Sequence, residues 1–168
     1  MKARKLTAQQ FAPIIRYFYN AYGAEQMKAS YEWDSPSTRM YPGERAWAFS
    51  DTLKTEPETG LKTEAESVVG WGSMHFNTRD AEQGDAVLIV GVFPEAQRKG
   101  YRTKILDWMT ERAKKLGATS VSMIVYKANE SHYKRIMRET HTEGSPWIYA
   151  GDCWHPAPGF GMFVRPLT

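Results

Sequence analysis

The chain has 168 residues, of which 42% are hydrophobic and 24% charged, and these values predict one globular domain over residues 1–168. Its 22 Lys and Arg and 19 Asp and Glu give a net charge of +3, too small an excess to indicate a nucleic-acid-binding protein. No apolar run approaches the ~20 residues needed to cross a bilayer, and one cysteine excludes an intrachain disulfide. Because the chain also starts without the apolar core of a signal peptide, we expect a cytoplasmic protein without membrane or nucleic-acid partners.

The first predicted elements are a short strand at residues 2–6 and an amphipathic helix after it. Thr7 and Gln10 have the spacing of a capping box, which predicts that the helix begins there. Apolar side chains then recur with the helical period at Phe11, Ile14, Ile15, Phe18 and Tyr22. Gly23 is expected to end or interrupt this helix, and residues 24–32 are expected to form a second one.

The next part of the chain is predicted to contain two strands separated by a polar segment. Residues 45–49 and 67–76 have the composition of strands. The acidic segment 51–66 between them is rich in turn residues and is predicted to be a surface loop. Residues 77–84 are predicted to form a turn.

Strands and helices alternate in the second half of the chain. A continuous apolar run at residues 87–90, followed by Gly91, Val92 and Phe93, predicts a strand covered on both faces. The elements expected after it are a basic amphipathic helix at 98–116, a strand at 121–125, a helix at 129–138, and strands at 147–150 and 160–164. The order is then βααβββαβαββ. It indicates a single α/β (α+β) domain with a mixed central sheet, helices on both faces and one parallel strand–helix–strand unit.

The segment from Val92 to Arg102 joins the buried strand to the start of the next helix. A helix N-terminus presents unpaired backbone N–H groups and a partial positive charge, and both favour phosphate binding. Gly100 permits close approach of a ligand to the backbone, while Arg98 and Lys99 add positive charge. These features predict a diphosphate site, and the alternative is a plain loop before a solvated helix.

The same segment resembles the main acetyl-CoA signature of the GNAT superfamily of N-acetyltransferases. The residues that match the pattern are Val92, Pro94, Glu95, Gln97, Gly100 and Leu106. The resemblance implies that acetyl-CoA is a co-substrate, that residues 97–102 hold its diphosphate, and that its pantetheine arm lies where strand 90–92 separates from strand 121–125. The CoA-binding residues that it implies are Val90, Val92, Gln97, Arg98, Lys99, Gly100, Tyr101, Arg102 and Asn129.

Arg102 departs from the family pattern, which has a small residue at this position. Its long side chain either clashes with the diphosphate or swings out and pairs with a phosphate. The first outcome would weaken or abolish CoA binding.

The resemblance also places a catalytic acid on the helix that begins at Asn129. Family members often have a tyrosine at the position that Ile136 occupies here. Tyr133 lies on the same helical face and is the candidate acid for the departing CoA thiolate. Its alternative role is that of a packed core aromatic.

A general base is needed to take the proton of the acceptor ammonium, unless water does so. Asp85 lies near the start of the central strand, where some family members use a carboxylate, and its alternative role is that of a turn residue beside Gly84. His75 and Glu66 on the preceding strand are further candidates.

Two functions are open at this point. The first is an N-acetyltransferase that moves the acetyl group of acetyl-CoA to an unidentified primary amine by direct attack in a ternary complex. The second is a GNAT-fold protein with little or no catalysis that acts as a binding or structural subunit of a larger assembly such as a virion, a reading that Arg102 and Ile136 favour. A homodimer is also open. No metal is expected, because Cys153 and His155 are too few ligands for a zinc site.

Overall fold

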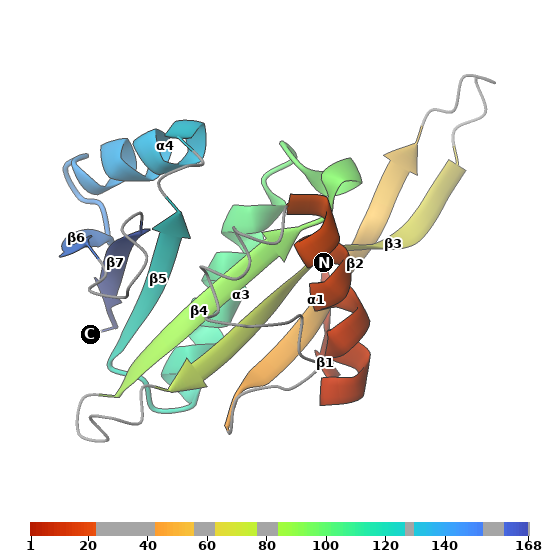
Figure 1. Cartoon of the computed structure of the whole chain (residues 1–168), viewed down its shortest axis with the longest axis horizontal. Coiled ribbons are helices and arrows are strands. Elements are labelled where there is room, and N and C mark those ends of the chain that lie inside the picture. Colours follow the sequence, from red (N-terminus) through yellow and green to blue (C-terminus); the bar gives the residue numbers. More distant parts are fainter. Residues whose placement is uncertain (23–42, 56–62, 77–83, 127–129, 153–159, 168) are drawn as a thin grey trace.

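The computed structural model describes residues 1–22, 43–55, 63–76, 84–126, 130–152 and 160–167. They form a seven-stranded sheet (Figure 1) with the strand order β1-β2-β3-β4-β5-β7-β6. The strands are β1 (Lys2–Leu6), β2 (Arg45–Thr55), β3 (Thr63–Phe76), β4 (Asp85–Val92), β5 (Ser120–Tyr126), β6 (Ile148–Asp152) and β7 (Phe160–Pro166). Every pairing among them is antiparallel except that of β4 with β5, so the predicted mixed sheet and its parallel unit are confirmed.

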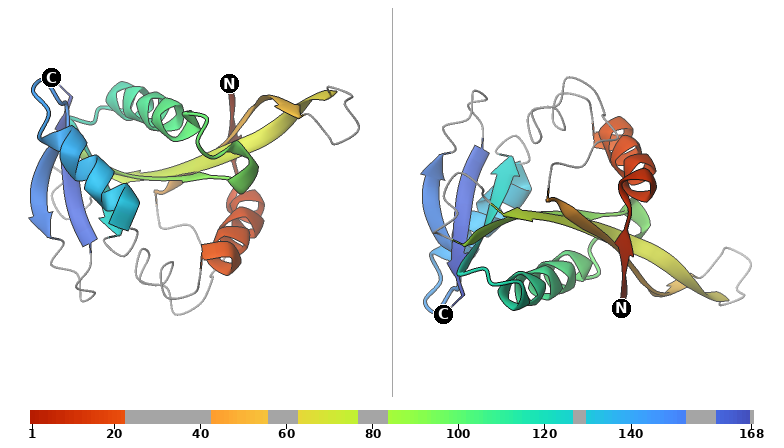
Figure 2. Two further views of the ribbon diagram at one scale, coloured as in Figure 1. Left: turned by 90° about the horizontal axis from the view of Figure 1, so that it is seen from above. Right: turned by 90° about the horizontal axis from the view of Figure 1, so that it is seen from below.

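Helices cover both faces of this sheet, as the sequence predicts. They are α1 (Ala8–Tyr22), the short 3-10 helix η2 (Pro94–Ala96), α3 (Tyr101–Lys115) and α4 (Glu130–Thr140). Figure 2 shows α1 on one face and α3 on the other. The second helix expected at residues 24–32 lies outside the described residues.

The α1 helix begins with the predicted capping box. Gln10 N donates to Thr7 Oγ1 at 3.2 Å, and Thr7 N donates to Gln10 Oε1 at 3.0 Å. The apolar face of α1 packs on the first strands in one of the two cores of the molecule. The buried residues of this core are Leu6, Phe11, Ile15, Phe18, Ala46, Ala48 and Trp71.

The larger core lies on the other face, under α3 and α4. Ile105 and Met109 of α3 are fully buried there, as is Phe163 of β7. Two glycines of β3 allow α3 to lie close to the sheet. A methyl group at Gly70 would come within 2.7 Å of Ile105 Cδ1, and one at Gly72 within 3.0 Å of Met109 Sδ. This close packing fixes the start of α3 relative to the end of β4.

The predicted surface loop at residues 51–66 is wrong at both of its ends. The pairing of β2 with β3 continues to Thr55 and Thr63, whereas β1 pairs only with residues 46–50 and β4 only with residues 70–76. The outer parts of β2 and β3 therefore form a two-stranded arm that projects from the sheet (Figure 1). The sequence did not reveal the arm because its strands are rich in charged and polar residues and lack an alternating apolar face.

Candidate functional site

The parallel strands β4 and β5 separate part of the way along their length. They pair only from Asp85 to Leu88 and from Ser120 to Met123. Beyond this point β4 stays paired with β3, and β5 stays paired with β7. A gap therefore opens between β4 and β5 toward their carboxyl ends, as the family resemblance implies.

Val90 and Val92 of β4 turn their backbone groups toward this gap. Phe93 N donates to Val69 O at 3.0 Å, so Val92 and Gly70 face each other as a non-hydrogen-bonded pair of the antiparallel ladder. The N–H and C=O of Val92, and of Val90 two residues earlier, then point away from β3. The Val92 carbonyl accepts a hydrogen bond from Gln97 Nε2 at 3.3 Å.

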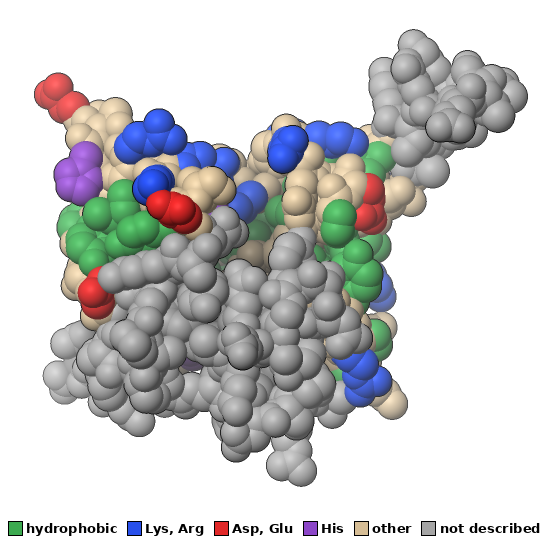
Figure 3. All heavy atoms as spheres, turned by 45° about the horizontal axis from the view of Figure 1, so that its top comes forward, with side chains coloured by type: hydrophobic (Ala, Val, Ile, Leu, Met, Phe, Trp, Pro, Cys, Tyr) green, Lys and Arg blue, Asp and Glu red, His purple; other side chains and the backbone are tan. Residues whose placement is uncertain are grey.

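The loop after β4 ends in an open helix N-terminus. Arg98 and Gly100 both have left-handed backbone conformations, with φ of 62° and 78°. Such conformations turn successive N–H groups toward one side and form an anion-binding concavity. Gly100 is the N-cap of α3 and provides no side-chain cap, so the first N–H groups of α3 are available to a ligand. Basic side chains gather on both sides of a hollow at the top of Figure 3.

Tyr101, in the first turn of α3, points elsewhere. Its side chain is buried and its hydroxyl donates to Asp51 Oδ2 at 3.1 Å. The residue thus fastens the root of the β2–β3 arm to α3. Lys99, by contrast, is exposed.

Arg102 extends from the first turn of α3 across the gap. Its Nη2 lies 3.7 Å from Sδ of Met123 on β5. Burial, and then the charge of Arg135, lower the pKa of this guanidinium to about 10, although Glu139 acts in the opposite direction. Within the described part of the chain, Arg102 has no carboxylate partner at ion-pair distance. A partly buried cation without a counter-ion is unfavourable, and a bound anion would supply one.

Two side chains of α4 complete a basic cluster around Arg102. Arg135 donates from Nη2 to Nδ1 of His132, with 3.4 Å between the two nitrogens. Burial, followed by the charges of Arg102 and Arg135, lowers the pKa of His132 to about 4. His132 and Arg135 could not be identified from the sequence, because only the packing of α4 on β5 brings them to the gap. Asn129, which was predicted to contact CoA, lies outside the described residues.

Tyr133 lies over β7 near the open end of the gap. Its ring contacts Phe163, with centroids 6.3 Å apart, and a methyl group at Gly161 would come within 2.8 Å of Cε2. The Tyr149 hydroxyl donates to Asp152 Oδ1 at 2.6 Å and also hydrogen-bonds with Tyr133. Asp152 first, and Tyr133 second, raise the pKa of Tyr149.

Asp85 occupies the closed end of the gap. Its two carboxylate oxygens accept hydrogen bonds from the hydroxyls of Ser120 and Ser122, each at 2.8 Å. Asp85 thus joins β4 to β5 where their pairing begins. Seven residues separate it from Val92, which corresponds to roughly 23 Å along a strand.

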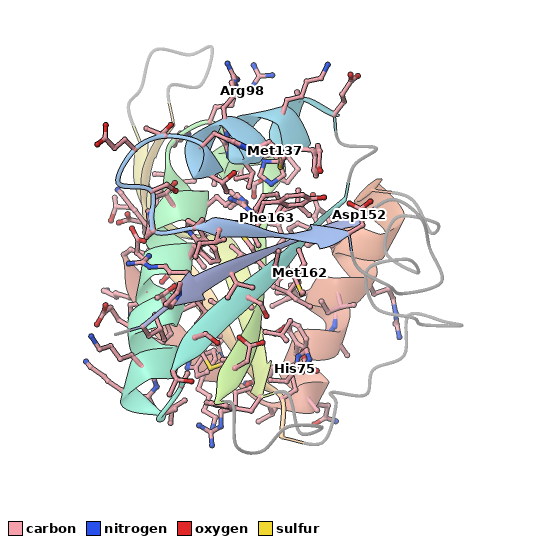
Figure 4. The ribbon with its side chains drawn as sticks, turned by 90° about the vertical axis from the view of Figure 1, so that its left-hand side faces the viewer. His75, Arg98, Met137, Asp152, Met162 and Phe163 are labelled. Carbon is pink, nitrogen blue, oxygen red and sulfur yellow. The ribbon has the colours of Figure 1, made fainter. Side chains whose placement is uncertain are left out.

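His75 lies near Asp85 and near Glu44, a buried residue just before β2. Burial lowers the pKa of His75, while the charges of Glu44 and Asp85 act to raise it. In Figure 4, His75 lies on the α1 side of the sheet, at the end opposite to Arg98. Glu66 is not in this group, because it pairs with Lys2 at 3.2 Å and accepts from Ser50 at 3.0 Å on the β2–β3 arm.

The described residues show no metal-binding cluster and no membrane-spanning helix. Within the described ranges, no three His, Cys, Asp or Glu side chains lie close enough together to hold a metal ion. The helices in those ranges are also too short or too polar to span a bilayer. Cys153 and His155 lie outside the described residues.

Comparisons with known proteins relate this arrangement to acyl transfer. The sequence matches the model of the acetyltransferase (GNAT) family over residues 18–135, and a search of curated proteins finds no match. Among solved structures, a GCN5-related N-acetyltransferase from Kribbella flavida is 19% identical with a TM-score of 0.58, covering 99% of this chain and 97% of that one.

Two further solved structures have the same fold. A Klebsiella pneumoniae protein assigned as an acyl-CoA N-acyltransferase is 14% identical with a TM-score of 0.62, covering 99% of this chain and 97% of that one. The spermidine/spermine N-acetyltransferase SpeG from Vibrio cholerae is 12% identical with a TM-score of 0.60, covering 98% and 92%. At these identities the likeness shows the fold alone.

Proposed function

The chain belongs to the acetyltransferase (GNAT) family, and from this premise we propose that it transfers the acetyl group of acetyl-CoA to a primary amine in a ternary complex. The observation that carries the proposal is the gap between β4 and β5, which has an open helix N-terminus and Arg102 at its mouth. The backbone along the gap gives hydrogen-bond donors for a pantetheine arm. The helix N-terminus and Arg102 give positive charge for a diphosphate.

The donor-binding residues act in two groups. The N–H groups of residues 97–102 bind the diphosphate, because the left-handed Arg98 and Gly100 turn this backbone into a concavity. Arg102 supplies a charge-assisted hydrogen bond from inside the mouth of the gap, and His132 and Arg135 face it from α4. This chain thus has Arg102 as a phosphate ligand at the position where the family pattern has a small residue.

The backbone of β4 positions the thioester for attack. The N–H groups of Val90 and Val92 point into the gap, and each is suited to donate to the oxyanion that forms when the amine attacks. Bound acetyl-CoA supplies the activated acyl group. The protein contributes orientation and charge stabilisation, so no covalent enzyme intermediate is required.

Protons move at two places in this proposal. Tyr133 is the acid for the CoA thiolate, and its hydroxyl also hydrogen-bonds with Tyr149. The acceptor ammonium loses its proton on the α1 side, to His75 or to Asp85 through water. His75 is the better placed of the two, because both oxygens of Asp85 already accept from serine hydroxyls.

Thermal unfolding with acetyl-CoA tests the donor site. A ligand at ~100 times its Kd stabilises by about 2.7 kcal/mol, which raises the melting temperature of a protein of this size by roughly 5–10 °C. We expect this rise with millimolar acetyl-CoA. The absence of any rise would overturn the proposed function.

Two glycines at opposite ends of α3 provide matched variants. Gly100 and Gly117 both have positive φ, 78° and 91°, and a methyl group at either would meet no atom within 4 Å. Gly100→Glu and Gly117→Glu therefore bring similar backbone strain and the same charge. Only Gly100→Glu should abolish the stabilisation by acetyl-CoA, and equal effects of both variants would contradict the assigned diphosphate site.

Catalysis is tested separately, by release of free CoA thiol with a panel of primary amines. Thiol release that depends on an amine supports the transferase. Stabilisation by acetyl-CoA without acetylation of any amine would favour the second function, a GNAT-fold binding or structural subunit. Equilibrium sedimentation of the same sample tests whether the chain forms a homodimer or a larger assembly.

A further inference from the structure

Three side chains of β3 form a row on the α1 side of the sheet. Gly70 and Gly72 face α3, so the alternate residues Trp71, Ser73 and His75 face α1. The Trp71 ring confirms this direction, because it packs against two aromatic rings of α1. Its centroid lies 5.3 Å from that of Phe11 and 5.5 Å from that of Phe18.

Two members of this row have a buried polar atom without a hydrogen-bond partner. Trp71 is 2% exposed and Ser73 is 0% exposed. Neither Nε1 of Trp71 nor Oγ of Ser73 makes a hydrogen bond with any residue in the described part of the chain. Leaving such a group unsatisfied is destabilising, and native proteins satisfy most buried polar groups. A row with two of them is therefore expected to have a polar partner in a complex.

The row lies beside the part of β4 that faces the gap. Trp71 pairs with Gly91, which lies between Val90 and Val92, and Ser73 pairs with Ile89. The indole lies directly over Gly91, where a methyl group would overlap Nε1. Residues two apart on a strand are roughly 6.7 Å apart, so the two polar groups lie within reach of one small molecule at the thioester.

Negative charge lies at the far end of the row. The buried carboxylate of Glu44 and the carboxylate of Asp85 both act electrostatically on His75, two residues beyond Ser73. These carboxylates attract a cation and repel an anion. A ligand of the row therefore carries an amine and an uncharged oxygen that accepts hydrogen bonds, rather than a free carboxylate.

We propose that Trp71 and Ser73 bind the acceptor through an amide carbonyl or hydroxyl oxygen, so that the acceptor belongs to the amino-acid amides, peptides and amino alcohols. This inference rests on the proposed function, because it places the acceptor beside the thioester. The indole N–H and the serine hydroxyl donate to the oxygen, which leaves the amine of the same molecule facing the thioester. Simple alkylamines lack the atom that the row recognises.

Two amines that differ in one group test this specificity. Glycinamide carries a carboxamide group where ethylamine has a methyl group. Trp71→Phe and Ser73→Ala should each lower kcat/KM for glycinamide about tenfold and leave kcat/KM for ethylamine unchanged. Comparing each variant with the wild type for the same amine cancels the different basicity of the two amines. Equal losses for both amines, or no loss for either, would overturn the proposal.

Trp47→Phe is the control for loss of an indole. Trp47 is also buried, but it faces the other core and contacts Trp108, with ring centroids 5.5 Å apart. This variant should affect both amines equally. A loss selective for glycinamide in Trp47→Phe would mean that the discrimination does not come from the row.

A binding measurement separates this inference from the proposed function. In a proton–nitrogen NMR spectrum with CoA present, the indole signal that disappears in Trp71→Phe belongs to Trp71. Glycinamide should shift this signal and ethylamine should not, and the result does not depend on catalysis. A selective shift without acetylation supports the row and contradicts the transferase. Acetylation with no selective shift supports the transferase and overturns the row.

Discussion

The guanidinium of Arg102 lies 3.7 Å from the thioether of Met123, so a side chain of α3 bridges the gap to β5. The bridge is weak, because a thioether sulfur is a poor hydrogen-bond acceptor. It leaves a partly buried cation without a carboxylate partner in the described residues. This arrangement is unfavourable in the free protein and becomes favourable when an anion is bound.

Arg102→Ala should therefore have opposite effects on folding and on binding. The free energy of unfolding of the free protein should stay the same or rise, because a partly buried cation without a carboxylate partner among the described residues is lost. The affinity for CoA should fall about 10- to 100-fold, the effect of one hydrogen bond to a charged group. Calorimetric titration with CoA and thermal unfolding measure the two effects. Lys114→Ala, at the exposed far end of α3, is the control. Unchanged affinity in Arg102→Ala would remove Arg102 from the binding site.

CoA binding should take up a proton at His132. Burial, Arg102 and Arg135 lower the pKa of His132 to about 4 in the free protein, so the ring is neutral at pH 7. A diphosphate beside these three groups favours the charged ring and raises its pKa. The complex then binds more protons than the free protein, and affinity should increase as the pH falls from 7 toward 5. Calorimetry in two buffers of different ionisation enthalpy measures the uptake. His132→Gln should reduce it, and the same uptake in both proteins would contradict the assignment.

Two buried serines should respond differently to alanine. Among the described residues Ser73 Oγ is buried without a hydrogen-bond partner, whereas Ser122 Oγ donates to Asp85 at 2.8 Å. Ser73→Ala removes an unsatisfied group, so the free energy of unfolding should stay the same or rise. Ser122→Ala removes a hydrogen bond to a charged group and should lower it by about 1.5–3 kcal/mol. Chemical denaturation of the two variants checks both values. A clear loss of stability in Ser73→Ala would show that its hydroxyl is satisfied in the free protein.

Arg98 holds a backbone conformation that costs a non-glycine residue roughly 1–2 kcal/mol, with φ of 62°. Arg98→Gly should therefore be more stable than Arg98→Ala by about 1 kcal/mol. Both variants lack the guanidinium, so their difference in chemical denaturation isolates the backbone term. Equal stability of the two variants would mean that the left-handed conformation is not populated in solution.

The sequence predicted the part of the site that is built from neighbours in the chain. The β4 strand, the loop at Gly100 and the start of α3 follow one another, so periodicity, glycine placement and the family signature all identify them. The same signature predicted the fold. Arg102 was recognised as a departure, but its direction toward Met123 required the packing of α3 on the sheet.

The parts that the sequence missed depend on register between distant strands. Ser120 and Ser122 meet Asp85 only because β4 and β5 pair in parallel with this alignment. Trp71 lies over Gly91 of β4 only because these two residues pair. A shift of one residue would turn each of these side chains to the opposite face. Periodicity within one strand does not contain that information.

The short pairing of β4 with β5 divides the sheet into two parts. Strands β1 to β4 form one part of the sheet, and strands β5, β7 and β6 form the other. The junction between the two parts consists of four residue pairs, from Asp85↔Ser120 to Leu88↔Met123. The hydrogen bonds that the hydroxyls of Ser120 and Ser122 donate to Asp85 strengthen this junction. A pantetheine arm in the gap would extend this junction. Its amides would hydrogen-bond to the backbone groups of β4 and β5 that do not pair with each other. The donor substrate would then act as an additional strand, and amide hydrogens in both parts of the sheet should exchange more slowly while it is bound.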